Sequence, residues 1–382
     1  MPKIVETLRE APHLYQRTAR FAEAADWLSF LLTGEHTAGV CCAGLKALYT
    51  ENGFPSNAFC CALESRLDGI YGSKVCTRIR KSGESVGRLT ARGAALIGLA
   101  EGTPVAAPIA DACAAMPALA AIDDKEMTLI VGTSNVDLIL SKEMHVIPGV
   151  FSFAKDAILP DLYLLEAGQA GAGDMFSWFV HNGVPRVYEE AAEAEGVSIH
   201  AYLRQKASAL EIGESRLMVL DWFNGNRSIL KNEALTGMIL GLTLRTRPEE
   251  IYRALIEATA YGTRRIVETF EEGGVPIERL CVAGGIAQKD PMMMQIYADV
   301  LGKELRIAGS TQSAARGCAI YAAVAAGICR SVSDAVAKYA LPDKAHYSPI
   351  PQNVNAYNRL YEEYKILHDY FGKGGNDVMM RL

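Results

Sequence analysis

The spacing of apolar residues over the first hundred positions predicts a mostly helical region. Between Val5 and about Thr33 the apolar residues recur at helical intervals, and Thr33-Gly34 supplies an end signal. The expected apolar stripe consists of Phe21, Trp27, Leu28, Leu31 and Leu32. A loop-rich stretch follows, and a further helix is expected from Thr90 to Leu99, before Glu101-Gly102-Thr103-Pro104. The clearest domain boundary therefore lies near Gly102.

Beyond this boundary the pattern changes to short β-rich runs that end in glycine and are followed by helices, which is typical of a layered α/β domain. Met127 to Val131 and Val136 to Leu140 are expected to pair as a hairpin around Gly132-Thr133-Ser134-Asn135. A third strand is expected over 162–165. Three glycines then precede a helix that Asp174 could cap, with Phe176, Phe179 and Val180 on its buried face.

The rest of the second region alternates in the same way. The segment between Pro185 and Gly213 is charged and helical in character. Pro248 is expected at the first position of a long helix that Gly273-Gly274 ends. A strand from Leu280 to Ala283 runs into Gly284-Gly285, and Asp290-Pro291 opens the next helix as a cap followed by proline. The last unit of this kind is expected over 313–327.

Composition narrows the class of protein. The chain has 382 residues, half of them hydrophobic, which allows two domains with substantial cores. A formal charge of −6 without a basic cluster argues against nucleic acid as a partner. The most apolar stretch, 94–122, is interrupted by Glu101, Pro104, Pro108 and Asp111, so no membrane segment is expected.

Cysteine usage and the first positions of the chain bear on its location. The nine cysteines form no pair of Cys-x-x-Cys motifs at zinc spacing, and an odd number in a long chain indicates reduced thiols. No secretory apolar segment is expected in the first ten positions. We therefore expect a cytoplasmic protein without a protein-bound structural metal.

Four glycine-bearing segments lie at predicted strand ends: 132–134, 168–173, 284–285 and 310–317. A glycine at such a place lets backbone N–H groups approach a phosphate, and a following helix N-terminus favours negative charge. Each one alone is more often simply a turn. Their succession in one domain is what indicates a nucleotide site.

The same succession carries a resemblance to a known family. Gly132-Thr133-Ser134, Glu166-Ala167-Gly168-Gln169, the phrase Leu220 to Ser228 and Ala283 to Pro291 follow one another as they do in the ribulokinase branch of the FGGY carbohydrate kinases. Shorter matches are Glu23 to Trp27, Leu32-Thr33-Gly34, Ala43 to Leu48, Gly237 to Leu242 and Glu250 to Ala254. The resemblance covers essentially the whole chain.

The resemblance implies a ribonuclease H-like fold of the actin, hexokinase and Hsp70 superfamily, an α/β fold with sugar and ATP in a cleft between two domains. The family's opening phosphate hairpin is not found upstream of Asp26, so the first domain is expected to be partial and the second complete. The expected division is 1–102 on the sugar side, 103–345 on the nucleotide side and 346–382 as a helical tail. A homo-oligomer or a complementing N-terminal polypeptide would then be possible partners.

By resemblance, Asp111 is the catalytic base that takes the proton of the sugar hydroxyl, a task that suits a positioned carboxylate. Taken alone, this residue would be read as a helix cap or turn residue; the family context favours the base. The residues around it differ from the sequence that is usual in the family at this place; here they are Ala107-Pro108-Ile109-Ala110-Asp111-Ala112-Cys113. Lys46 and Glu166 match positions that contact ribulose in ribulokinases. Taken alone, Lys46 would be read as a solvated surface lysine and Glu166 as a capping carboxylate.

The remaining matches concern the nucleotide. Gly132, Thr133 and Ser134 resemble a phosphate loop, Gly173 and Ser177 fall at nucleotide contacts, and Gly284-Gly285 lies against the adenosine, with Gln288 a weaker candidate. Mg²⁺ is expected to be held mainly by the phosphates. The resemblance therefore implies ATP-dependent phosphorylation of ribulose or a similar ketopentose. The competing interpretation is an inactive remnant that binds nucleotide weakly or needs a separate N-terminal polypeptide.

Overall fold

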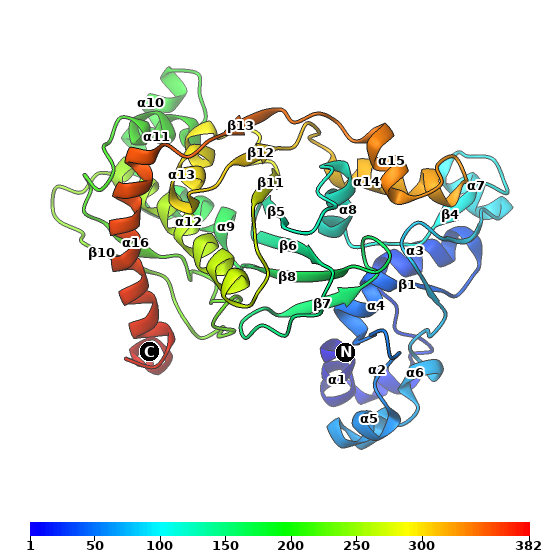
Figure 1. The fold of residues 1–382 in the computed structure, drawn as a ribbon. Helices are drawn as coiled ribbons and strands as arrows, with labels where there is room; N and C mark the ends of the chain where they lie inside the picture. The colour runs from blue at the N-terminus through cyan, green and yellow to red at the C-terminus, as the bar shows by residue number, and fades with distance from the viewer.

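A seven-stranded mixed sheet forms the centre of the protein in the computed structural model, which describes residues 1–382 (Figure 1). Its spatial order is β13-β12-β11-β5-β6-β8-β7, and only the β11–β12 and β11–β5 pairs are parallel. The strands are β5 (Glu126–Val131), β6 (Asn135–Ser141), β7 (Ser152–Lys155), β8 (Tyr163–Gln169), β11 (Arg279–Ala283), β12 (Leu305–Ile307) and β13 (Ala345–Tyr347).

Alternating side chains let this sheet bury both faces. The predicted hairpin is confirmed: β5 and β6 pair antiparallel, with Val131 opposite Asn135 across the turn. Met127, Leu129 and Val131 point into one core, as the two-residue period of a strand requires. Ile130 points to the opposite face, where it packs against a smaller alanine-rich cluster.

Helices cover each face of the sheet. The larger core contains 44 buried residues and lies under α9 (Ala172–Gly183), α12 (Pro248–Glu272) and α13 (Pro291–Leu301). The other face packs against α8 (Asp111–Ala118), α14 (Ser313–Ala325) and α15 (Val332–Tyr339). The predicted start of α12 at Pro248, its end at Gly273 and the Asp290 cap of α13 are all confirmed.

The outer elements of this half complete the larger core. The charged segment after Pro185 forms α10 (Arg186–Ala194) and α11 (Ile199–Ser208), as predicted. The small hairpin of β9 (Met218–Leu220) and β10 (Met238–Leu240) follows. The long α16 (Pro351–Gly372) packs tyrosines onto this core, and α17 (Val378–Arg381) ends the chain. None of these helices is both long and apolar enough to cross a membrane.

The first hundred residues form a smaller region to one side of the sheet, at the lower right of Figure 1. Its own core contains seven buried residues, among them Leu8, Cys60 and Leu67. Its elements are α1 (Pro2–Glu10), α2 (Pro12–Arg17), α3 (Ala24–Thr33), β1 (Ala38–Gly39), α4 (Val40–Ala47), α5 (Asn57–Leu63), a 3₁₀ turn (Ser65–Leu67), α6 (Ile70–Ser73), β2 (Ile79–Arg80), β3 (Ser85–Arg88), α7 (Ala91–Ile97) and β4 (Pro104–Ala106).

The stretch from Val5 to Thr33 is mostly helical, as expected, but it is not continuous. Three helices occupy this stretch, and the first break falls at Ala11, which has an extended φ of −135°. Pro12 follows it, and a proline disfavours the helical conformation of the residue before it. The second break contains Phe21, which forms an isolated bridge with Val75 instead of joining a helical stripe.

The buried face of α3 is also different from the one that the apolar stripe suggested. Asp26, Ser29 and Thr33 are buried, whereas Trp27 is 52% and Leu28 54% exposed. The polar residues can face inward because each finds a local partner: the hydroxyls of Ser29 and Thr33 donate to carbonyls one turn earlier, and Asp26 accepts from the Gly39 N–H.

The chain around the expected boundary at Gly102 is tied to what precedes it. β3 and β4 pair antiparallel on either side of residue 102, and the Gly102 N–H donates to the Leu89 carbonyl. The helix expected to reach Leu99 ends earlier, because Gly98 adopts a left-handed conformation with φ of +71°. The division into 1–102, 103–345 and 346–382 stays a prediction.

Candidate functional site

The predicted phosphate-loop residues and the start of α9 lie against each other. The turn Gly132-Thr133-Ser134 joins β5 to β6, and the Gly173 N–H donates to the carbonyls of Gly132 and Thr133 at 3.1 and 2.9 Å. A Cβ on Gly173 would lie 2.4 Å from the Gly132 carbonyl oxygen. Only glycine therefore allows α9 to begin this close to the turn.

Gly284-Gly285 lies beside the same turn, because β11 runs parallel to β5 and ends next to it. Gly284 has φ of +113°, and a Cβ there would lie 2.0 Å from the Val131 carbonyl oxygen. A Cβ on Gly285 would meet nothing within 4 Å. The structure thus brings three of the predicted glycine turns to one edge of the sheet, and Gly285 faces open space there.

Ser177 and Gln288, two further residues predicted at the nucleotide, differ in whether their side chains are free to bind a ligand. Ser177 lies one turn after Gly173 on the exposed face of α9. The Gln288 side chain instead donates to the Ala308 carbonyl at 2.6 Å, and its oxygen accepts from the Lys344 ammonium at 3.0 Å. Gln288 is therefore the least available member of the predicted nucleotide set.

In the fourth glycine segment, 310–317, the glycine itself lies at a contact between two helices. Gly317 lies within α14, and a Cβ there would lie 1.6 Å from the Ala114 carbonyl oxygen of α8. This glycine lets the two helices pack at short distance. Asp111 is the first residue of the helix that Gly317 contacts, α8.

Asp111 is the first residue of α8 and is exposed. The cap position belongs to Ala110, and no side chain caps the helix, so the reading of Asp111 as a cap is not supported. The thiols of Cys41 in α4 and Cys113 in α8 contact each other in a common buried cluster. This contact ties the helix of Lys46 to the helix of Asp111.

Lys46 and Glu166 reach the same place from different elements. Glu166 lies in β8 opposite Ser152 of β7, and α4 packs on β7 so closely that a Cβ on Gly44 would lie 2.5 Å from that of Ala154. Burial raises the pKa of the Glu166 carboxyl, the positive charge of Lys46 opposes this, and the negative charge of Asp111 adds to it. These three residues, far apart in sequence, therefore form one electrostatic group.

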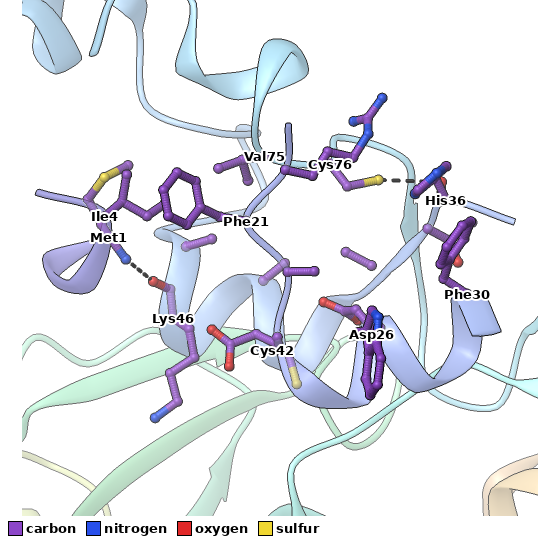
Figure 2. A pocket seen from close by; sticks show the side chains of 18 of the residues that line it. Met1, Ile4, Phe21, Asp26, Phe30, His36, Cys42, Lys46, Val75 and Cys76 are labelled. Carbon is purple, nitrogen blue, oxygen red and sulfur yellow. Dashed lines mark hydrogen bonds between the residues drawn. The ribbon is translucent and has the colours of Figure 1, made fainter. Parts of the chain in front are cut away.

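A cavity of about 310 Å³ lies beside this group in the first region and is lined mainly by apolar residues (Figure 2). Lys46 contributes to its rim, where its carbonyl accepts from the Met1 amine and its ammonium points away from that amine. Asp26 also borders the cavity, and burial raises the pKa of its carboxyl to about 6. Of the three residues of this group, only Lys46 lines the cavity; Asp111 and Glu166 do not.

Sequence reasoning missed a buried polar network beneath the glycine turns. The Asn135 amide donates to Gln169 at 2.7 Å, and the Gln169 amide donates to Asp221 at 2.7 Å. Tyr364 of α16 also donates to Asp221, at 3.0 Å. Asn135, Gln169 and Asp221 lie within or next to the sequence motifs that carry the family resemblance. Their contacts with one another are visible only in the structure.

Comparison with known proteins gives a consistent assignment. The C-terminal domain of the FGGY family of carbohydrate kinases matches residues 127–326. A ribulokinase of Bacillus licheniformis is 46% identical over 387 residues, which cover all of this chain and 70% of that protein. A ribulokinase of Geobacillus thermodenitrificans is 44% identical over all of this chain and 68% of its own length.

Solved structures agree on the fold. A xylulose kinase of Rhodospirillum rubrum superposes with a TM-score of 0.78 at 24% identity, over 96% of this chain and 70% of that one. A ligand-bound xylulose kinase of Lactobacillus acidophilus gives a TM-score of 0.81 at 16% identity, over 97% and 72% of the two chains. The chain therefore belongs to the FGGY family of carbohydrate kinases, which are ATP-dependent sugar kinases.

Proposed function

We propose that the chain phosphorylates a ketopentose, with ribulose as the first choice, at a terminal hydroxyl and with ATP as donor. The observation that carries this proposal is that the charges of Lys46 and Asp111 both act on the buried Glu166 carboxyl, while the Cys41–Cys113 contact joins the helices of Lys46 and Asp111. Ribulokinases with 44–46% identity over the whole chain supply the choice of sugar. A cation and a carboxylate suit a polyhydroxy substrate, because both make charge-assisted hydrogen bonds with hydroxyls.

In the proposed reaction the Asp111 carboxylate takes the proton of the sugar hydroxyl, whose oxygen attacks the γ-phosphorus in line with the departing ADP. Lys46 and Glu166 hold the sugar so that this hydroxyl is the one presented. An exposed carboxylate at the first position of a helix is free to approach a substrate. The role of the protein is then mainly positioning and charge stabilisation.

For the nucleotide, we propose that the N–H groups and hydroxyls of Thr133 and Ser134 bind the phosphates, with Gly173 and Ser177 beside them. Gly284 and Gly285 would lie against the adenosine, where the open space at Gly285 leaves room for it. No group of three or more His, Cys, Asp or Glu side chains is placed to hold a metal ion. Mg²⁺ would therefore be bound mainly through the phosphates and water.

Coupled ADP release with a panel of ketopentoses and polyols tests this function directly. Ribulose should give the highest kcat/KM, and xylulose, ribitol and glycerol should give lower values. The Glu166→Gln variant should lose most of the discrimination, because the carboxylate that accepts from the hydroxyls is gone. Preference for another sugar would overturn the choice of ribulose, and ADP release without dependence on any sugar would overturn the kinase assignment of the site.

A further inference from the structure

The phrase from Asp221 to Ser228 wraps around the end of β8. The Asn224 amide donates to the Ala170 carbonyl at 3.3 Å, and the Ser228 hydroxyl accepts from the Gly168 N–H at 3.2 Å. With Asp221 accepting from Gln169, three side chains of the phrase bind three consecutive residues of this strand end. The phrase therefore fixes the segment that carries Glu166 and leads to Gly173.

Arg227 of the same phrase reaches further. Its Nη2 donates to the Asn135 carbonyl at 3.2 Å, and its guanidinium carbon lies 5.0 Å from the centre of the Phe151 ring. A Cβ on Gly168 would lie 2.4 Å from the same Nη2, so the glycine makes room for the arginine. The guanidinium is thus held by a carbonyl, a ring and a closely approaching backbone.

Two acidic residues lie around this guanidinium. Asp137 is fully buried, and neither of its carboxylate oxygens has a hydrogen-bond partner; the buried Nε of Arg227 has none either. Burial raises the pKa of the Asp137 and Glu166 carboxyls, and the positive charge of Arg227 opposes this rise at both. Glu166 lies two residues before Gly168 in β8, so the two share a face of the strand, and the guanidinium approaches that face at Gly168.

We propose that Arg227 is a positioning residue shared by both substrate sites: it holds the Asn135 carbonyl next to the Gly132–Ser134 turn, and its charge stabilises the Glu166 carboxylate at the sugar site. This inference rests on the proposed function for its meaning in the reaction. Asn135 follows the phosphate turn directly, so one side chain touches the backbone of one site and the electrostatics of the other. Displacing it should therefore disturb both.

The charge of Arg227 affects the pKa of Glu166 in one direction. Burial raises the pKa of its carboxyl, and the cations lower it, so loss of the Arg227 charge must raise it further. The titratable or charged groups that act on Glu166 from the surrounding elements, or feel its charge, are Lys46 of α4, Asp111 and Cys113 of α8, Asp137 of β6 and Arg227. Among these charged groups, only Lys46 and Arg227 favour the ionised carboxylate; a hydrogen bond from the Ser152 side chain favours it as well.

The test is a carbon-13 NMR titration of glutamate-labelled protein, in which the Glu166→Gln variant identifies the Glu166 signal. Arg227→Gln should move the titration midpoint of Glu166 upward by about one pH unit, as expected for loss of a nearby opposite charge. Arg227→Lys should move it by less than half as much. Arg186→Gln, which removes an exposed arginine of α10, should not move it.

An unchanged Glu166 midpoint in a folded Arg227→Gln protein would overturn the proposal. Should that variant not fold, Arg227→Lys decides instead, because an ammonium lacks the second N–H arm of the guanidinium. Amide exchange over 132–136 should then be several-fold faster, and unchanged exchange would contradict the proposal. Since the titration needs no sugar, failure of ribulose to bind would count against the proposed function alone.

Discussion

The two regions of the molecule differ in the size of their β-sheets and of their hydrophobic cores. The second region has a seven-stranded sheet with helices on both faces and a core of 44 buried residues. The first has two-stranded sheets and a separate core of seven. All predicted nucleotide residues lie in the second region, which has the larger core, whereas Lys46 lies in the first. In the proposed function, sugar binding therefore draws on the region with the smaller core, and nucleotide binding does not.

The largest effect should come from Asp111, which stands where the two regions meet. Asp111→Asn removes the proposed base and should lower kcat by roughly 10²–10⁴-fold while leaving ATP affinity unchanged. Asp123→Asn, the same change at another exposed aspartate, is the matched control and should keep full turnover. Coupled ADP release and calorimetry with ATP measure the two quantities. Near-normal turnover of the Asp111 variant would show that another group is the base.

Two glycines of the second region should separate packing from ligand binding. Gly317→Ala forces α14 away from α8 and should cost about 1–3 kcal/mol of unfolding free energy, since overpacking strains a tight contact. Gly285→Ala meets open space and should leave the free energy of unfolding nearly unchanged while weakening ATP binding. Urea unfolding and nucleotide calorimetry compare them. If Gly317→Ala were neutral, the close approach of the two helices would be in doubt.

Two buried carboxylates, one in each region, should show different pH dependence. Burial raises the pKa of Asp137 to about 7 and that of Asp26 to about 6. When the pKa of a carboxyl is higher in the folded state than in the unfolded state, the folded protein becomes less stable as the pH rises. The loss occurs between the unfolded-state pKa, near 4, and the folded-state pKa. For Asp137 this loss reaches about 4 kcal/mol at most.

Substitution by asparagine should flatten the corresponding slope. Asp137→Asn should remove much of the decline in global unfolding free energy between pH 4 and 7, because Asp137 lies in the central sheet. Asp26→Asn should change only local opening of the first region, seen as amide exchange around α3. Unfolding free energies measured across this pH range are the test. If the unfolding free energies of the wild type and of Asp137→Asn changed equally between pH 4 and 7, the raised pKa of Asp137 would be contradicted.

The smallest effect should come from the exposed apolar face of α3. Trp27→Ser and Leu28→Ser should change the unfolding free energy by less than about 0.5 kcal/mol, since both side chains are half exposed. They should instead reduce self-association, because an exposed apolar patch favours contact between molecules. Sedimentation velocity over a concentration series measures this. A substitution at buried Leu8, which belongs to the core of this region, should show the opposite pattern.

Local signals predicted much of the second region. The hairpin of β5 and β6, the start of α12 at Pro248 and the Asp290 cap of α13 depend on residues next to each other in sequence, and all three were predictable. The inward face of α3 was not, because the polar residues Asp26, Ser29 and Thr33 are satisfied by backbone groups that no hydrophobic period reveals.

The candidate site shows the same limit. The glycine turns were visible as strand ends, but their meeting at one sheet edge follows from the parallel pairing of β5 with β11. Asp111, Lys46 and Glu166 were grouped by family resemblance and not by spacing. Arg227 stood in a quoted phrase without any sign of its role, because its partners Asn135 and Phe151 are 92 and 76 positions away in sequence.

The central claim is that Lys46 of the first region and Glu166 of the second bind one sugar. A double-mutant cycle on ribulose affinity tests it most directly, with Lys46→Gln, Glu166→Gln and the double variant measured by calorimetry. The account predicts that each single change weakens binding at least tenfold, and that the double variant is weaker by much less than the product of the two. Strictly additive losses, or ribulose affinity unaffected by either change, would contradict a shared sugar site.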